Sequence, residues 1–199
     1  MMSKRTRPSI ARWALLAVLI CAGAGAASWF TYQKFFAWKR FDVVDSGTLY
    51  RSGLLQEWQL KEAIDRYRIK TVFSLTFTKN DAYQKICDQK GVKRYFAYLP
   101  GDGVGPDDPY LRFLQVASDP MNHPILVHCS AGVQRTGGAV ALYRSVIQGW
   151  DFDDAIREMV AKGNEGLTPQ IEQLRHLNEQ LISSERCLIN IPKIASSRR

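Results

Sequence analysis

The sequence predicts an α/β fold in which a mostly parallel central sheet is flanked by helices. Along residues 48–184, short β-branched or apolar segments alternate with segments whose apolar residues recur at helical spacing. Gly- and Pro-containing stretches separate them, most clearly at residues 100–106. Strands that alternate with helices pair in parallel, because each helix returns the chain to the same edge of the sheet. A chain of 199 residues is long enough for one such domain with additional terminal segments.

Each expected element has its own local signal. The strands are expected at 48–51, 70–76, 92–99 and 125–128. The helices are expected at 56–67, 81–90, 107–117, 136–148, 151–161 and 168–184. The last begins with Thr168 as N-cap and Pro169 at the first helical position. The expected organisation is a basic N-terminus (1–12), an apolar segment (13–33), a linker (34–47), the α/β domain (48–185) and a tail (186–199).

Positive charge gathers around the apolar segment. Residues 1–40 carry seven basic side chains and no acid, whereas the rest of the chain is nearly neutral and contains all 19 acidic residues. The net charge of +8 therefore favours a membrane partner and not nucleic acid. Residues 13–33 are free of charge over a length that spans a bilayer as a helix, which predicts a single N-terminal transmembrane helix.

A cleaved signal peptide is the alternative for this segment. The small residues at 22–27 resemble a cleavage region, with Ala24 and Ala26 at suitable positions. The apolar run continues past these alanines, which favours an uncleaved anchor. The excess of basic residues before the segment predicts a cytoplasmic N-terminus with the domain on the far side of the membrane. If the segment is cleaved, the domain is secreted or periplasmic.

One stretch carries the chemistry, at His128-Cys129-Ser130-Ala131-Gly132-Val133-Gln134-Arg135-Thr136-Gly137. An apolar strand leads into Cys129, and an apolar helix follows Arg135. A loop between a strand and a helix N-terminus aims its backbone N–H groups at one point and forms an anion site. The same field lowers the pKa of a cysteine that faces this point and makes its thiolate a nucleophile. The planar guanidinium of Arg135 can hold two phosphate oxygens, so no metal or cofactor is expected.

This stretch resembles the signature HCxxGxxR(S/T)G of the cysteine-dependent protein tyrosine phosphatases, dual-specificity branch. The resemblance covers residues 43–184 and implies that Cys129 attacks phosphorus and forms a phosphocysteine. It further implies that Arg135 binds phosphate, Thr136 assists thiolate departure and His128 supports the loop. The loop residues would bind substrate mainly through backbone amides; they are Ser130, Ala131, Gly132, Val133 and Gln134.

The family also implies a general acid on an upstream loop. Asp102 is the preferred candidate because it lies in a Gly/Pro-rich loop that follows an expected strand. Asp107 and Asp108 are the alternatives, although their place before a helix suits capping.

The resemblance implies a phosphorylated protein as substrate. A lipid or inositol phosphate remains an alternative, weakened because the loop contains no lysine. An inactive phosphate-binding module is a further alternative, and the intact Cys129, Arg135 and Asp102 argue against it.

Overall fold

The computed structural model describes residues 10–35, 37–77 and 81–183. The chain divides into two compact units, Met1–Ala37 and Trp38–Arg199. The expected tail at 186–199 lies outside the described residues.

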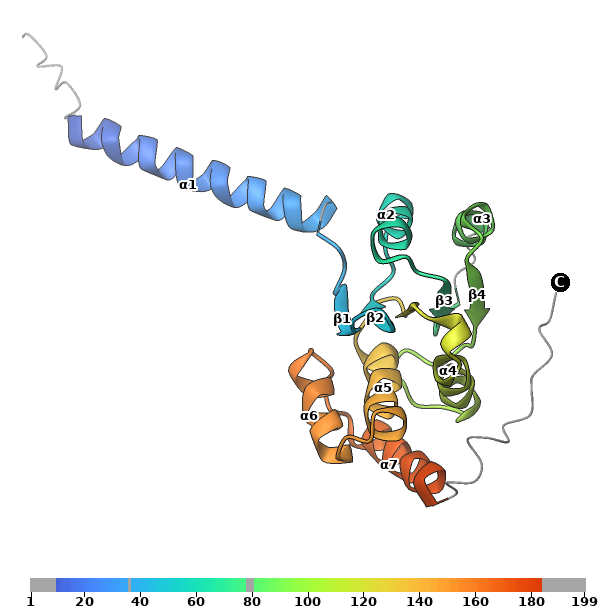
Figure 1. Ribbon diagram of the computed structural model, residues 1–199. Coiled ribbons are helices and arrows are strands. Elements are labelled where there is room, and N and C mark those ends of the chain that lie inside the picture. The colour runs from blue at the N-terminus through green and yellow to red at the C-terminus, as the bar shows by residue number, and fades with distance from the viewer. Residues whose placement is uncertain (1–9, 36, 78–80, 184–199) are drawn as a thin grey trace, which may run out of the picture. The chain divides into compact units, whose positions relative to one another are not determined.

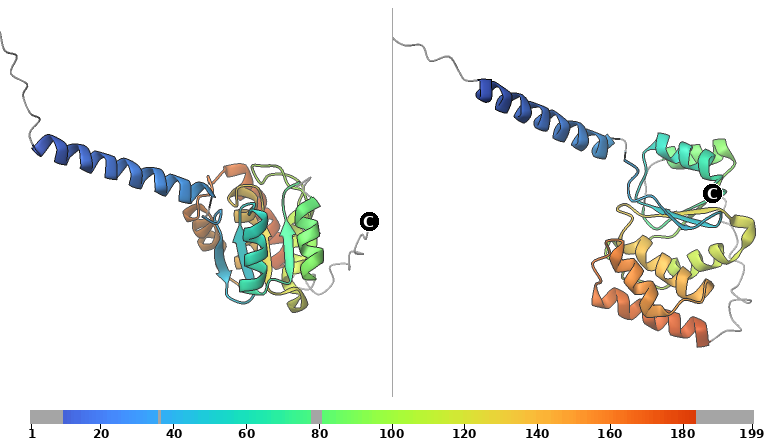
Figure 2. Two further views of the ribbon diagram at one scale, coloured as in Figure 1. Left: turned by 90° about the horizontal axis from the view of Figure 1, so that it is seen from above. Right: turned by 60° about the vertical axis from the view of Figure 1, so that its left-hand side comes forward.

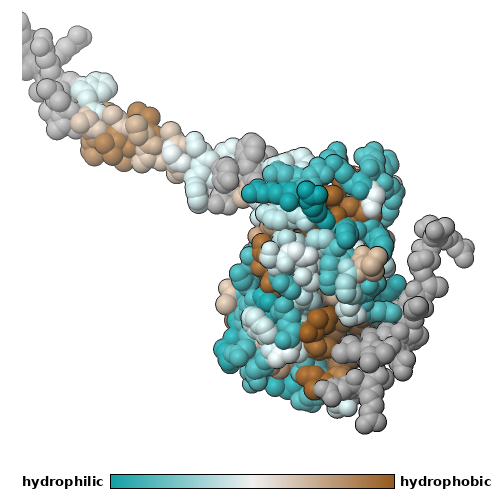
Figure 3. All heavy atoms as spheres, in the orientation of Figure 1, coloured by the Kyte–Doolittle hydropathy of each residue, from teal (hydrophilic) through white to brown (hydrophobic). Residues whose placement is uncertain are grey.

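The described residues of the first unit form one helix, α1 (Ile10–Phe35). Its large apolar side chains are exposed and gather in its N-terminal part, where Figure 3 shows them in brown. Within the part of the chain that the structure describes, no helix combines the length and the apolar character needed to cross a membrane. The transmembrane helix expected at 13–33 is therefore not supported.

The second unit is built on a sheet of five strands in the order β1-β2-β5-β3-β4. These strands are β1 (Asp42–Asp45), β2 (Leu49–Ser52), β3 (Thr71–Ser74), β4 (Lys93–Phe96) and β5 (Ile125–His128). β2, β5, β3 and β4 pair in parallel, and β1 joins the edge antiparallel to β2. The prediction of a mostly parallel sheet is confirmed, with one antiparallel edge strand.

Helices cover both faces of the sheet. α2 (Glu57–Tyr67) and α3 (Asp81–Lys90) lie on one face. The other face carries α4 (Asp108–Ser118), α5 (Gln134–Leu142), α6 (Phe152–Ala161) and α7 (Thr168–Ser183). Figure 1 and the right-hand view of Figure 2 show the two helical layers on either side of the strands. Two shorter elements are a 3-10 turn, Pro120–Asn122, and a π-helical turn, Tyr143–Ile147, which extends α5.

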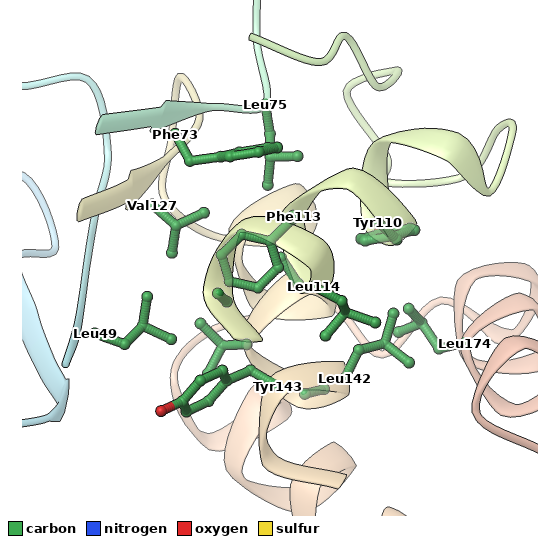
Figure 4. Close-up of a cluster of buried hydrophobic side chains, with 14 of the residues drawn as sticks. Leu49, Phe73, Leu75, Tyr110, Phe113, Leu114, Val127, Leu142, Tyr143 and Leu174 are labelled. Atoms are coloured by element: carbon green, nitrogen blue, oxygen red, sulfur yellow. The ribbon is translucent and has the colours of Figure 1, made fainter. Parts of the chain in front are cut away.

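Strand alternation supplies two cores. Phe73 and Val127 face the larger helical layer, whereas their neighbours Val72 and Leu126 face α2 and α3. Figure 4 shows the larger core, in which strand side chains meet Phe113 of α4. β5 lies at the centre of the sheet and is buried on both faces. The residue that follows it is therefore held rigidly at the carboxyl end of the parallel strands.

The start of the domain corrects the predicted linker at 34–47. β1 lies inside that range, and its carboxylates make contacts far along the chain. Asp45 Oδ2 accepts hydrogen bonds from Tyr143 Oη at 3.0 Å and from Gln148 Nε2 at 3.2 Å, and Asp42 pairs with Lys162. The sequence pattern did not predict this strand because it carries aspartate at both ends, where strand propensity is low.

Candidate active site

The loop of residues 129–133 leaves the centre of the sheet and enters α5. β5 ends at His128 and α5 begins at Gln134, so the strand–loop–helix arrangement predicted from the sequence is confirmed. Cys129 comes directly after the central strand, and Arg135 lies in the first turn of the helix. The fold therefore brings the predicted nucleophile and the predicted phosphate-binding arginine to one loop at the carboxyl edge of the sheet.

Gly132 allows the loop to turn tightly against β2. Its φ is +76°, in the left-handed region where a Cβ atom is strained. A Cβ at this position would also lie 2.4 Å from the backbone nitrogen of Gly53. A glycine is thus required here both by conformation and by space.

The Cys129 thiol is buried and poised to ionise. Its side chain is 1% exposed, and the Gly132 N–H donates to its Sγ at 3.1 Å. Burial opposes ionisation, but the hydroxyl and amide of Thr136, the Gly132 amide and the charge of Arg135 outweigh it and lower the pKa of the Cys129 thiol. The buried Thr136 hydroxyl has no other hydrogen-bond partner within the described residues, which leaves it to stabilise charge on the sulfur.

The Arg135 guanidinium is held by the walls of the site. It is 9% exposed, with Nη1 donating to the Leu99 carbonyl at 3.4 Å and Nη2 to Ser130 Oγ at 3.3 Å. Ser130 Oγ in turn lies 2.9 Å from Thr76 Oγ1 at the end of β3. Both guanidinium bonds are long, and Nε is buried without a partner, so a planar oxyanion can compete for these donors.

His128 supports the loop as a neutral side chain. It is fully buried at the end of β5, and its Nε2 lies 2.7 Å from Ser74 Oγ on the neighbouring strand. Burial, together with the charges of Arg94 and Arg135, lowers its pKa from 6.5 to about 4. A histidine that is neutral at physiological pH fixes the strand end without adding charge beside Cys129.

Asp102 lies on a loop that the structure ties to α4. Its side chain is exposed, and Oδ1 accepts the Val104 N–H at 3.0 Å. The adjacent Gly103 carbonyl accepts a hydrogen bond of 2.8 Å from the hydroxyl of Tyr110, which is fully buried on α4. Burial raises the pKa of the Tyr110 hydroxyl, on which the charges of Cys129, Asp102 and Arg135 also act. The Tyr110 hydroxyl is therefore linked to the Asp102 loop by a hydrogen bond and to Cys129 by charge.

A buried amide joins the Asp102 loop to the phosphate loop. Gln170 Nε2 of α7 lies 3.3 Å from the Tyr110 hydroxyl and donates to the Gln134 carbonyl at 2.9 Å. Asn164 Nδ2 holds Gln170 Oε1 at 3.1 Å. No sequence motif pointed to these three side chains, because their roles depend on contacts between helices.

The two alternative acids have other surroundings. Asp107 Oδ1 accepts a 2.7 Å hydrogen bond from Gln173 Nε2 of α7 and makes no capping bond. Asp108 is the exposed first residue of α4. Asp102 is favoured because its carboxylate is exposed and accepts a hydrogen bond only from the nearby Val104 backbone within the described residues.

Within the described residues, no group of three or more His, Cys, Asp or Glu side chains could hold a metal ion. Cys87 is buried on α3, and burial raises the pKa of its thiol to about 11. It is therefore a packing residue and not a second nucleophile.

Comparisons with known proteins match this geometry. A model of the tyrosine phosphatase family matches residues 36–165. The chain is 38% identical over 122 residues to the dual specificity protein phosphatase TpbA of Pseudomonas aeruginosa, covering 59% of this chain and 52% of that protein. It is 36% identical over 160 residues to the inositol diphosphatase DSP3 of Arabidopsis thaliana, covering 76% of this chain and 75% of that protein. The chain thus spans about half the length of TpbA and three quarters of DSP3.

Solved structures share the fold. The catalytic core of the PP-IP phosphatase Siw14 from S. cerevisiae, in complex with citrate, superposes with a TM-score of 0.64 at 20% identity, covering 78% of this chain and 97% of that chain. The crystal structure of P. aeruginosa TpbA superposes with a TM-score of 0.56 at 27% identity, covering 75% and 99%. The matched family region includes β1, which agrees with a domain that starts before residue 48.

Proposed function

Because the chain belongs to the tyrosine phosphatase family, we propose that it hydrolyses phosphomonoesters through a phosphocysteine intermediate on Cys129. The observation that carries this proposal is the geometry of the loop. A buried thiol with a lowered pKa accepts a hydrogen bond from the Gly132 N–H at 3.1 Å and lies on the loop that leads into α5, whose first turn carries Arg135. The thiolate of Cys129 can attack a phosphoryl group, while the Gly132 N–H and the guanidinium of Arg135 can stabilise the negative charge.

The reaction has two steps. In the first, the Cys129 thiolate forms a bond to phosphorus, the bond from phosphorus to the leaving oxygen breaks, and Asp102 gives that oxygen a proton. Loop amides and Arg135 hold the phosphoryl oxygens. In the second, Asp102 takes a proton from water as the water oxygen attacks phosphorus. The phosphorus–sulfur bond then breaks, and the Thr136 hydroxyl stabilises the returning thiolate.

A phosphorylated protein is the proposed substrate class. TpbA, a dual specificity protein phosphatase by name, supports this proposal at 38% identity. The inositol diphosphatase DSP3, at 36% identity over a longer stretch, supports an inositol phosphate as the second candidate. Arg135 is the only basic residue from Cys129 to Gly137, which favours a substrate with a single phosphate over a densely charged one.

The proposal is tested by phosphate release from a panel of phosphopeptides, inositol phosphates and lipid phosphates in the presence of EDTA. We expect release that survives EDTA, with a phosphopeptide among the best substrates. If the folded protein releases no phosphate from any substrate of the panel, the result would support an inactive phosphate-binding module. A preference for inositol diphosphates would replace the proposed substrate class and leave the mechanism intact.

Asp102 as general acid is tested with leaving groups of different basicity. We expect Asp102→Ala to lower kcat by about 100-fold on an alkyl phosphate, whose leaving oxygen needs a proton, and by much less on an activated aryl phosphate. Asp107→Ala is the matched control, because that carboxylate accepts from Gln173. A selective loss in Asp107→Ala, with Asp102→Ala unaffected, would move the role to Asp107.

Attachment to a membrane through residues 13–33, with the domain on its far side, remains a prediction from the charge distribution of the sequence. Fractionation of cells that express the full chain, followed by protease accessibility of the domain, tests both points. Recovery of the uncleaved full chain in the soluble fraction would contradict them.

A further inference from the structure

The outer side of the phosphate loop is held by three donors from one segment of the chain. The carbonyl of Ser130 accepts from the Leu54 N–H at 3.2 Å, and that of Ala131 accepts from Arg40 Nη1 at 3.2 Å. The carbonyl of Gly132 accepts from Arg51 Nη2 at 2.9 Å. Three consecutive carbonyls are thus drawn away from the site by residues between 40 and 54.

This arrangement fixes the direction of the inner amides. In a trans peptide the carbonyl of one residue and the N–H of the next point in opposite directions. Carbonyls that point outward at Ala131 and Gly132 therefore turn the N–H groups of Gly132 and Val133 inward. The Gly132 N–H is indeed the one that donates to Cys129 Sγ, at 3.1 Å.

Arg51 is the most firmly placed of the three donors. It is 4% exposed in β2, and its backbone lies opposite Val127 of the central strand. Arg40 is exposed and Leu54 offers only its backbone. Burying a guanidinium is costly, and burial lowers the pKa of Arg51, while the charges of Asp42, Glu158 and Cys129 offset this in part. Arg51 is thus a buried cation whose position in the fold costs desolvation free energy.

We propose that Arg51 is a positioning residue of the active site, which holds the Gly132 carbonyl outward and so keeps the Val133 N–H of the same peptide aimed at the transferring phosphoryl group. This inference rests on the proposed function for its kinetic consequence only. Its effect on the Cys129 thiol is a property of the resting protein and can be measured without a substrate.

Several groups besides Arg51 act on the Cys129 thiol, and the test changes Arg51 alone. Arg135 and Thr136 face it from α5, Tyr110 from α4, and His128 from β5 as a neutral ring. The charge of Asp102 acts on the same Tyr110 hydroxyl. Loss of Arg51 removes a positive charge that acts on Cys129 and frees the Gly132–Val133 peptide, which follows the Gly132 amide that donates to Sγ. Both changes are expected to raise the pKa of the thiol.

The first test measures the rate at which iodoacetamide alkylates the Cys129 peptide of the full chain as a function of pH. In Arg51→Ala we expect the midpoint to move to higher pH, and kcat at about pH 6 to fall by about tenfold or more with a smaller change in KM. Arg144→Ala is the matched control, because Arg144 is a mostly buried arginine that pairs with Glu158 and makes none of the loop bonds. It should leave the midpoint in place.

Two further measurements separate positioning from general loss of stability. Arg51→Lys keeps a charged donor in the same place and should lie between wild type and Arg51→Ala in both midpoint and kcat. A cavity of about 190 Å³ lined by Arg51 and Gly132 gives small ions access to this position. Guanidinium at millimolar concentration should therefore restore part of the activity of Arg51→Ala, and none in Arg144→Ala.

An unchanged alkylation midpoint in folded Arg51→Ala would overturn the proposal, as would an equal shift in Arg144→Ala. If Arg51→Ala does not fold, the test uses Arg51→Lys instead. An alkylation midpoint and a kcat equal to those of the wild type in Arg51→Lys would also contradict the positioning role. A shifted midpoint in a protein that hydrolyses no phosphate would retain the positioning role and reject the proposed function.

Discussion

Among single residues, burial and hydrogen bonding set the charge of two side chains at the end of β5, Cys129 and His128. Cys129 and His128 are adjacent and equally buried, but their environments act in different ways. The thiol is surrounded by donors, which lower its pKa and favour the thiolate. The imidazole of His128 is buried and lies near the charges of two arginines. Both effects lower its pKa and favour the neutral ring. A thiolate beside a neutral histidine is the result.

His128 makes stability depend on pH in a defined window. Its pKa is about 4 in the folded protein against 6.5 ordinarily. As pH falls, the unfolded chain binds this proton first, so stability is lost between about pH 6.5 and 4. Since one pH unit between two pKa values corresponds to about 1.4 kcal/mol, the loss reaches about 3 kcal/mol.

Urea unfolding at several pH values, compared with His128→Gln, measures this contribution. We expect the unfolding free energy of the wild type to fall more steeply than that of the variant within the window. Parallel pH profiles would mean that the histidine is not held neutral.

At the scale of elements, the phosphate loop shows what the sequence could predict and what it could not. The HCxxGxxR pattern between an apolar strand and an apolar helix was enough to locate the loop, because strand, turn and helix signals lie within it. The donors on its outer side were not predictable, since Arg40, Arg51 and Leu54 are distant in sequence. The edge strand β1 was not predicted because it carries aspartate at both ends, where strand propensity is low.

Gly132→Ala tests the close packing of this loop. A φ of +76° and a Cβ only 2.4 Å from Gly53 N require the backbone to move. We expect unfolding free energy to fall by about 1–3 kcal/mol and kcat to fall by about 100-fold. Gly91→Ala is the matched control, with a φ of +66° and nothing within 4 Å, so it should lower stability while leaving kcat intact. Equal effects of both substitutions on kcat would contradict the packing argument.

At the scale of the whole molecule, the sequence predicted the architecture better than the boundaries. Alternating strand and helix signals gave the mostly parallel sheet and its two helical layers, because these patterns repeat along the chain. The domain begins near Trp38 and not at residue 48, since an edge strand, an ion pair and hydrogen bonds to Asp45 join the earlier segment to it. The general acid could only be narrowed to three aspartates, because loop positions depend on tertiary contacts such as that of Tyr110.

Two truncations test where the domain begins. A fragment of residues 38–199 retains β1 and should unfold at about the same urea concentration as the full chain, with equal kcat. A fragment of residues 48–199 loses β1 and the Arg40 contact to the Ala131 carbonyl, so it should be less stable and less active. Equal behaviour of the two fragments would show that residues 38–47 are a linker after all.

The central claim is that Cys129 carries the phosphoryl group during turnover. The most direct measurement is rapid acid quenching of the full chain during hydrolysis of its best substrate, followed by mass analysis of the Cys129 peptide. We predict that a fraction of this peptide carries one phosphoryl group, that Cys129→Ser releases no phosphate, and that the adduct persists longer in Asp102→Ala. Normal phosphate release by Cys129→Ser, with no adduct on the wild-type peptide, would contradict the account.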